Sequence, residues 1–266
     1  MKKYKVGIII LMKGNVWLTK TLLNSVNRKE SYDKKLMTFY IADTGSSKEE
    51  KNEMKKYLAS ANLNCKYLEY DYYNFAKINN DVVKNYVKKS TDLILLCNND
   101  IEFQNDAIAN AVKCYDNNAD TIGTVGALLS FEDGNVQHGG ININRQGNKY
   151  LIRHYFIGNP AENEIISHIK EFKSFGNTGA FLLASKKDWD DIGGLNENYK
   201  DCFEDVEFNL SLLLYGRTNI TCFDAKCIHR ESSTRHQKLS QEDINRVLKY
   251  LADHTDELNI NDSSKK

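Results

Sequence analysis

The segment that most constrains the fold is a short apolar run that ends in polar residues. Leu93–Cys97 is apolar without interruption, and Asn98, Asn99 and Asp100 follow it directly. A run of this length, bounded by turn-forming residues, is typical of a strand buried on both faces. In an open parallel sheet, ligands bind outside the carboxyl ends of such strands. The run therefore predicts a core strand followed by either a simple polar turn or a site where Asp100 holds a divalent cation.

Strand and helix patterns alternate through the first half of the chain. Strands are expected at 5–12, 36–42 and 65–70, each followed by a helix, and the second helix starts with the capping-box pair Ser47 and Glu50. This alternation predicts a parallel sheet with right-handed crossovers, in which the loops after the strands share one rim. The loops expected there are those at Lys13, Asp43, Asn74 and Asn98.

The pattern changes in the second half. Residues 132–173 are rich in turns, and apolar strands are expected at 180–184 and 219–223. Phe203–Tyr215 has the spacing of a helix, and its first turn carries Glu204, Asp205 and Glu207. A purely structural explanation for these acids is the helix dipole, which favours negative charge there by about 0.3–1 kcal/mol per residue.

Length and composition exclude some classes of protein. A chain of 266 residues suits one large α/β domain, alone or with an appendage. Lys+Arg and Asp+Glu both total 36, and zero net charge argues against a general nucleic-acid binder. The six cysteines are scattered, so reduced thiols are expected, and the spacing of Cys222, Cys227 and His229 is poor for zinc. The start, Met1–Met12, lacks a cleavage site and is interpreted as the first strand, and no apolar stretch approaches a transmembrane length.

Four motifs occur in a particular order along the chain. They are Asp43-Thr44-Gly45-Ser46, Asn98-Asn99-Asp100, Phe203-Glu204-Asp205-Val206-Glu207 and His229. In this order they resemble the family 2 glycosyltransferases of the GT-A fold, over about residues 5–235. Shorter matches that add to the resemblance are Asn74–Asn80, Val136–Gly140, Gly176–Phe181 and Asp188–Leu195.

The resemblance implies an α/β fold of GT-A type. A Rossmann-like, mostly parallel central sheet would be flanked by helices and joined to a mixed acceptor-side half. A single GT-A domain is expected at 1–237, with a nucleotide-binding half at about 1–118 and an acceptor-side half at about 119–237. The remainder, 238–266, is expected to be a C-terminal helix and a frayed tail.

The resemblance also implies roles for individual residues. Asp205 matches the catalytic base, and Glu204 beside it is expected to hold the acceptor or orient Asp205. Asp100 and His229 match the ligands of Mn²⁺ or Mg²⁺, whereas Asn98 replaces the first acid of the family's DXD-type motif and suits a ribose hydroxyl. The residues expected to contact the nucleotide-sugar are Asp43, Asn74, Asn80, Asn98, Asn99, Asp100 and Gly179.

Other roles stay open at this point. Asp43 is expected to contact the nucleotide base, with capping of the following helix as the structural alternative. The Lys13-Gly14-Asn15 loop departs from the family's usual Pro/Asn-containing sequence, and His138 has no assigned role.

The resemblance implies an inverting, metal-dependent glycosyltransferase that moves a hexose from a nucleotide-sugar, with UDP favoured, to a hydroxyl. The acceptor partner would be a glycan, a lipid-linked sugar or a glycoprotein. Two alternatives are a non-catalytic sugar- or nucleotide-binding module on the same fold and a sugar nucleotidylyltransferase. The Lys-, Asn- and Ile-rich composition suggests a bacterial source, and a cytoplasmic location is expected, including the inner membrane surface.

Overall fold

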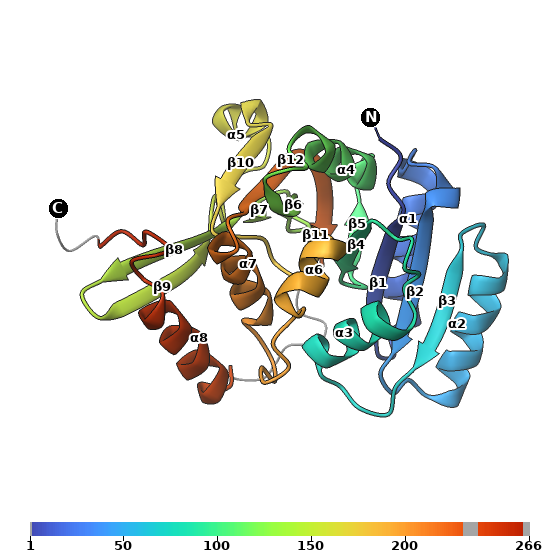
Figure 1. Cartoon of the computed structure of the whole chain (residues 1–266). Helices are drawn as coiled ribbons and strands as arrows, with labels where there is room; N and C mark the ends of the chain where they lie inside the picture. Colours follow the sequence, from blue (N-terminus) through green and yellow to red (C-terminus); the bar gives the residue numbers. More distant parts are fainter. Residues whose placement is uncertain (1, 231–238, 263–266) are drawn as a thin grey trace.

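The strand expected from the apolar run lies within a curled, mainly parallel sheet, shown in the computed structural model of Figure 1. The structure describes residues 2–230 and 239–262. In spatial order the sheet contains β10 (Glu171–Ser174), β12 (Thr218–His229), β6 (Ile122–Ser130), β11 (Phe181–Ser185), β4 (Leu93–Cys97), β1 (Val6–Met12), β2 (Met37–Asp43) and β3 (Cys65–Glu69). Two further short strands join it, β5 (Ile101–Phe103) on β12 and β7 (Val136–His138) on β6.

The sheet changes direction at β4. Strands β4, β1, β2 and β3 are parallel, as the alternating pattern predicts. The neighbour on the other side, β11, runs antiparallel to both β4 and β6. The segment that leads into β11 therefore meets the carboxyl end of β4, with Phe181 opposite Cys97.

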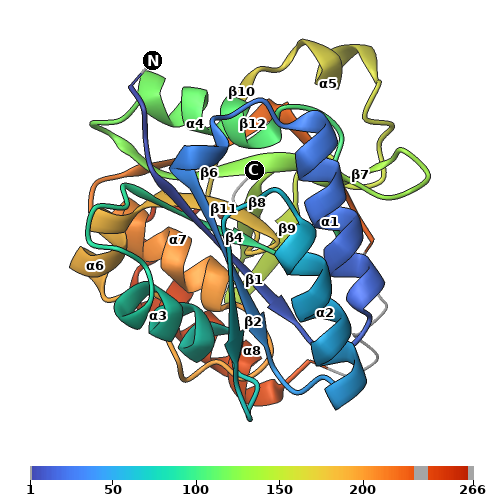
Figure 2. The same ribbon diagram turned by 90° about the vertical axis from the view of Figure 1, so that its right-hand side faces the viewer.

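Two layers of helices cover the sheet, as Figure 2 shows. One face is covered by α1 (Val16–Lys29), α2 (Lys48–Ser60) and α4 (Ala107–Asn117). The other face is covered by α3 (Phe75–Asn85), α6 (Lys186–Ile192) and α7 (Glu204–Leu214). Alternate residues of β4 enter the two cores, which is why its sequence is apolar throughout.

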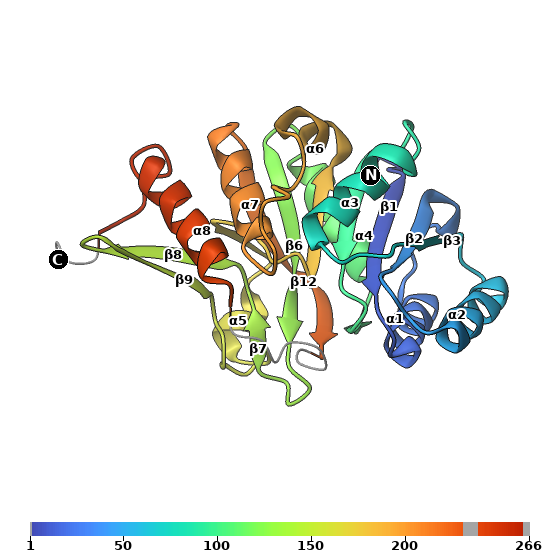
Figure 3. The same ribbon diagram turned by 90° about the horizontal axis from the view of Figure 1, so that it is seen from below.

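A third core lies at one end of the molecule. There α8 (Gln241–Asp253) packs beside α7 and beside the hairpin of β8 (Ile141–Gln146) and β9 (Lys149–His154), as seen from below in Figure 3. Buried apolar side chains from all of these elements meet in it, including Ile141, Val206 and Leu251.

Local signals explain most element boundaries. Ser47 and Glu50 form the expected capping box, in which each side chain accepts a hydrogen bond from the other residue's backbone N–H. The turn-rich stretch 132–173 contains more regular structure than expected, namely β7, β8, β9, β10 and the short helix α5 (Glu164–His168). A short 3₁₀ helix at Lys34–Leu36 precedes β2.

The longest strand also differs from expectation. A strand was predicted at 219–223, yet β12 continues to His229, because a register shift between Cys222 and Lys226 interrupts the apolar pattern without ending the strand. Helix α3 ends at Asn85. In the described ranges, no helix has the length and apolar character needed to cross a membrane.

Candidate active site

The candidate site lies along the carboxyl ends of the central strands. Met12 and Asp43 are register partners at the ends of β1 and β2, so the loops that follow them are adjacent. The backbone N–H of Asn98, just after β4, donates a hydrogen bond to the carbonyl of Ala180 at 3.0 Å. The loop before β11 is thereby joined to the Asn98–Asp100 turn, which brings the two halves of the chain to one rim.

Asp100 and His229 come together at this rim, although 129 positions separate them in the chain. Nε2 of His229 lies 3.2 Å from Oδ1 of Asp100, and both side chains are about nine-tenths buried. The pairing of β12 with β5 explains the approach, because it sets His229 opposite Ile101. The side-chain amide of Asn98 is 3.3 Å from the same imidazole nitrogen.

The surroundings of this pair suit a cation. Nδ1 of His229 lies 2.6 Å from Oε1 of Gln137, an acceptor, so Nδ1 carries a proton and Nε2 is the ring nitrogen that faces Asp100. Oδ1 of Asp100 is buried and has no hydrogen-bond partner. A buried carboxylate oxygen beside an imidazole nitrogen is a pair of ligands that Mn²⁺ or Mg²⁺ would accept. Within 2–230 and 239–262, no group of three His, Cys, Asp or Glu side chains converges on one point.

Asp205 occupies the first turn of α7, where two backbone amides hold its carboxylate. Oδ2 accepts a hydrogen bond from the N–H of Gly179 at 2.8 Å, and Oδ1 accepts one from Val206 at 2.7 Å. Glu204 is only 6% exposed, whereas Asp205 is partly exposed, so Asp205 is the more accessible of the two adjacent acids. Phe203, just before them, has a left-handed backbone with φ of 74°, an unfavourable conformation that often marks functional sites.

The close approach at Gly179 explains its residue type. A Cβ there would lie 3.3 Å from the ring of Phe75, the first residue of α3, and 3.6 Å from Cβ of Asp205. Gly179 thus places α3, the β11 loop and the candidate base next to one another.

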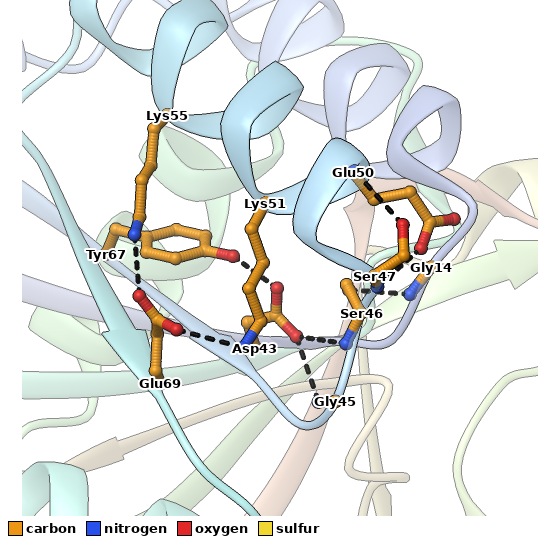
Figure 4. Close-up of polar contacts among 10 residues, drawn as sticks. All are labelled: Gly14, Asp43, Gly45, Ser46, Ser47, Glu50, Lys51, Lys55, Tyr67 and Glu69. Atoms are coloured by element: carbon orange, nitrogen blue, oxygen red, sulfur yellow. Dashed lines mark hydrogen bonds and ion pairs between the residues drawn. The ribbon is translucent and has the colours of Figure 1, made fainter.

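Asp43 is fully buried at the end of β2, and its carboxylate has internal partners, as Figure 4 shows. Oδ1 accepts hydrogen bonds from the N–H groups of Gly45 and Ser46, and Oδ2 accepts one from the hydroxyl of Tyr67. Burial and this bond raise the pKa of Tyr67. Ser46 accepts from the N–H of Gly14, which ties the first two loops of the rim together. Asp43 therefore holds the loop that follows β2, and its contact with the nucleotide base stays a prediction.

Asn74 and Asn80, also expected to contact the donor, bind the loop between α6 and α7 in this structure. Asn74 caps α3 by accepting from Lys77 N–H and donates to the carbonyl of Tyr199 at 2.9 Å. Asn80 makes two hydrogen bonds with the backbone of Leu195, one as donor and one as acceptor. Asn99 donates weakly to Thr19 of α1 at 3.4 Å.

A buried amide network that was not expected from the sequence lies directly behind Asp205. Asn209, one turn further along α7, donates to the carbonyls of Asp205 and Asn177 and accepts from Thr124 and from Asn177 N–H. Asn177 is itself fully buried and reaches β12 through Thr221 and Ile220, so its side chain does not line a pocket. Polar residues inside an apolar helix face are the only sequence signal for such a network.

His138 also lies in this region and is 1% exposed. Its Nε2 accepts a hydrogen bond from Thr178 N–H at 3.3 Å, and its ring stands edge-on to His154 with centroids 4.5 Å apart. Burial, reinforced by the neighbouring imidazole of His154, lowers the pKa of His138 well below its usual value, which keeps the ring neutral.

This sheet, with its change of strand direction beside β4, is the GT-A fold found in glycosyltransferases. Solved structures that share this fold include the following three. A GalNAc-T7 structure with UDP, GalNAc and Mn²⁺ matches with a TM-score of 0.74 and 12% identity, covering 96% of this chain and 50% of that one. The structure of S. aureus TarS 1–349 with UDP-GlcNAc matches with a TM-score of 0.67 and 15% identity, covering 98% of this chain and 68% of that one. The mannosyltransferase PcManGT from Pyrobaculum calidifontis, in complex with GDP-Man and Mn²⁺, matches with a TM-score of 0.63 and 13% identity. The match covers 88% of this chain and 59% of that one.

Among curated sequences, the chain is similar to the O-antigen biosynthesis protein RfbC of Myxococcus xanthus. The two are 25% identical over 240 residues, which is 87% of this chain and 18% of the relative. An uncharacterized protein, y4gI, of Sinorhizobium fredii is 27% identical over 61% of the chain, again 18% of the relative. The chain therefore spans less than a fifth of the curated relatives it matches. No protein-family model matches the sequence.

Proposed function

We propose that this chain is an inverting, metal-dependent glycosyltransferase that moves a hexose from a nucleotide-sugar to a hydroxyl group. The observation that carries the proposal is that two acidic residues, Asp100 and Asp205, lie at the same edge of the sheet. The unpartnered Oδ1 of Asp100 faces His229, and the partly exposed Asp205 approaches the same rim through Gly179. The fold and the similarity to an O-antigen biosynthesis protein support it.

Asp205 would act as the general base. Its carboxylate takes the proton from the acceptor hydroxyl as that oxygen bonds to the anomeric carbon of the donor. The bond from that carbon to the diphosphate breaks at the same time, and attack from the opposite face inverts the configuration. The N–H groups of Gly179 and Val206 hold the carboxylate in place, and Glu204 would orient it or hold the acceptor.

Asp100 and His229 are the residues that would hold Mn²⁺ or Mg²⁺, with Gln137 fixing the imidazole. A bound divalent cation supplies positive charge against the leaving diphosphate. Asn98 and Asn99 offer amides for the ribose or the phosphates, and Asp43, Asn74, Asn80 and Gly179 complete the proposed donor side.

We favour a UDP-linked hexose as the donor, with a glycan, a lipid-linked sugar or a glycoprotein as the acceptor. The UDP-containing GalNAc-T7 and TarS structures support this choice, whereas the GDP-Man complex of PcManGT makes a GDP-sugar the first alternative. We further propose a cytoplasmic location, at the inner membrane surface for a lipid-linked acceptor. The six free thiols support a reducing compartment.

A donor screen tests the proposal. Purified protein is incubated with a panel of UDP- and GDP-sugars, with Mn²⁺ or with a chelator, and released nucleoside diphosphate is measured. We expect metal-dependent release from one donor, increased by the matching acceptor. No release, together with no nucleotide binding by calorimetry, would refute the proposal. Binding without release, with acceptors present, would favour a non-catalytic module, and pyrophosphate production from a nucleoside triphosphate and a sugar phosphate would indicate a nucleotidylyltransferase.

A further inference from the structure

The C-terminal helix carries a buried carboxylate that binds the loop leading to the candidate base. Asp243, in the first turn of α8, is 0% exposed. Its carboxylate accepts hydrogen bonds from three successive backbone N–H groups, with Oδ2 at 2.8 Å from Asp201 N and 3.4 Å from Cys202 N, and both oxygens at 3.1 Å from Lys200 N. Successive amides that converge in this way form a concave anion-binding site, which is here occupied by the protein's own side chain.

The same loop is held by side chains from two other helices. Asn74 and Asn80 of α3 bind its backbone at Tyr199 and Leu195. Glu207 of α7 accepts from the hydroxyl of Tyr199 at 2.7 Å. These contacts fix the first part of the loop, up to Tyr199, whereas Asp243 binds its last part, which ends directly at the catalytic segment.

That last part has an unfavourable geometry. Phe203, the residue after Cys202, has a φ of 74°, and the candidate base follows it by two positions. A left-handed backbone at a phenylalanine is unfavourable and persists only where neighbouring contacts impose it. Hydrogen bonds to a charged, buried carboxylate are among the stronger contacts available for this purpose.

We propose that Asp243 is a positioning residue for Asp205, and that α8 is part of the catalytic half rather than an appendage. This inference rests on the proposed function of Asp205 as the base. By anchoring residues 200–202, Asp243 fixes the left-handed step at Phe203 and hence the direction in which the Asp205 carboxylate points. In this assignment Asp243 contacts neither the donor nor the acceptor. Its replacement should therefore lower kcat more than it changes the KM for the donor.

The chain offers a matched control on the same turn of α8. Glu242 is adjacent to Asp243 and also contacts Lys200, but through the ammonium group and at the surface, with its side chain 69% exposed. An exposed ion pair contributes little to the structure of the loop. Glu242→Gln therefore removes a charge and a contact to the same residue without affecting the buried carboxylate.

The test compares Asp243→Asn and Glu242→Gln in the full chain by two measurements. Hydrogen–deuterium exchange reports on the amides of residues 200–202, and steady-state kinetics give kcat and the KM for the donor. For Asp243→Asn we expect exchange of these amides to be about tenfold faster. We also expect kcat to fall about tenfold or more, with an unchanged donor KM. Glu242→Gln should match the wild type in both.

Each outcome is decisive. Faster exchange with a kcat equal to that of Glu242→Gln would overturn the positioning role, as would an equal loss of kcat and donor binding. If Asp243→Asn does not fold, Asp243→Glu replaces it, because this variant keeps the carboxylate but places it one methylene further out. It should fold and have a kcat below that of the wild type. A wild-type kcat would contradict the proposal. Failure of the underlying function looks different, because the wild type itself would then show no donor turnover, whatever the exchange data show.

Discussion

Individual acidic residues differ in how many partners they have, and this separates candidate roles. Asp43 and Asp243 are fully buried and use their oxygens on backbone amides or Tyr67, as residues that hold loops do. Asp100 keeps one buried oxygen without a hydrogen-bond partner, and Asp205 is partly exposed. The latter two are therefore the carboxylates suited to a metal and to a proton.

The first prediction concerns Asp205. Replacing it with Asn keeps the shape but removes the proton acceptor, so kcat for transfer should fall roughly 10²- to 10⁴-fold while the donor KM is retained. Asp190→Asn is the control, because Asp190 is an exposed acid paired with Lys186 on α6. Steady-state kinetics with a fixed acceptor measure both. An active Asp205→Asn enzyme would remove Asp205 from its proposed role.

A second prediction concerns the metal pair. Asp100→Asn removes the charge of the unpartnered oxygen, so affinity for Mn²⁺ in the presence of the nucleotide should weaken at least about tenfold. Calorimetric titration with Mn²⁺ measures the affinity. Glu102→Gln is the control, since Glu102 lies two residues away and pairs with Arg230. Equal affinities for the two variants would show that the cation binds elsewhere.

Helices and strands reach their positions here through close backbone approaches. Gly176 lies against α7, and a Cβ added to it would be 2.3 Å from Cβ of Asn209. At Gly126 of β6, an added Cβ would be 2.1 Å from Oδ1 of Asn177. These two glycines allow the buried amides to join α7, β6, β11 and β12, which is how the helix carrying Asp205 is fixed to the sheet.

At this level we predict that Gly176→Ala destabilises the fold, because the new methyl overlaps Asn209 and forces the amide network apart. The free energy of unfolding should fall by about 1–3 kcal/mol or more. Urea denaturation measures this, and Gly7→Ala on β1 is the control, since its nearest neighbours would be at an ordinary 3.5 Å. Equal urea midpoints for both variants would mean that the α7 contact relaxes freely.

The whole molecule joins a half with a parallel sheet to a half with a mixed sheet, and the candidate site takes residues from both. Asp100 and Asn98 follow β4, His229 ends β12, and Asp205 lies in the first turn of α7. Because a ligand at this rim would contact both halves, its binding should stabilise the protein as a unit.

We therefore predict a nucleotide-dependent rise in melting temperature that requires the metal. A ligand at one hundred times its dissociation constant adds about 2.7 kcal/mol to the stability of the folded state. Thermal melts with UDP and Mn²⁺ should show a rise of several degrees, which a chelator reverses. Mn²⁺ without UDP serves as the control. A UDP shift that persists with the chelator would place the nucleotide site apart from the metal pair.

Features that depend on neighbouring residues could be predicted from the sequence. The apolar run Leu93–Cys97 defined a doubly buried strand, the Ser47–Glu50 pair began a helix, and the alternation of elements predicted the parallel half with its rim. The ordered motifs were enough to predict the GT-A fold. All of these depend on local periodicity, capping or chain order, which can be read from the sequence alone.

The sequence does not show which polar side chains bind other parts of the protein and which stay available for a ligand; this depends on the folded chain. In the folded chain, Asp43 accepts a hydrogen bond from Tyr67, and Gln137 contacts the imidazole of His229. Asn74 and Asn80 donate hydrogen bonds to the loop between α6 and α7. The fold also places Asp243 against the loop before Asp205, on a helix that the sequence predicted outside the GT-A domain. The physical reason is that hydrogen bonds between distant segments depend on strand register and helix packing, and no local pattern in the sequence specifies them.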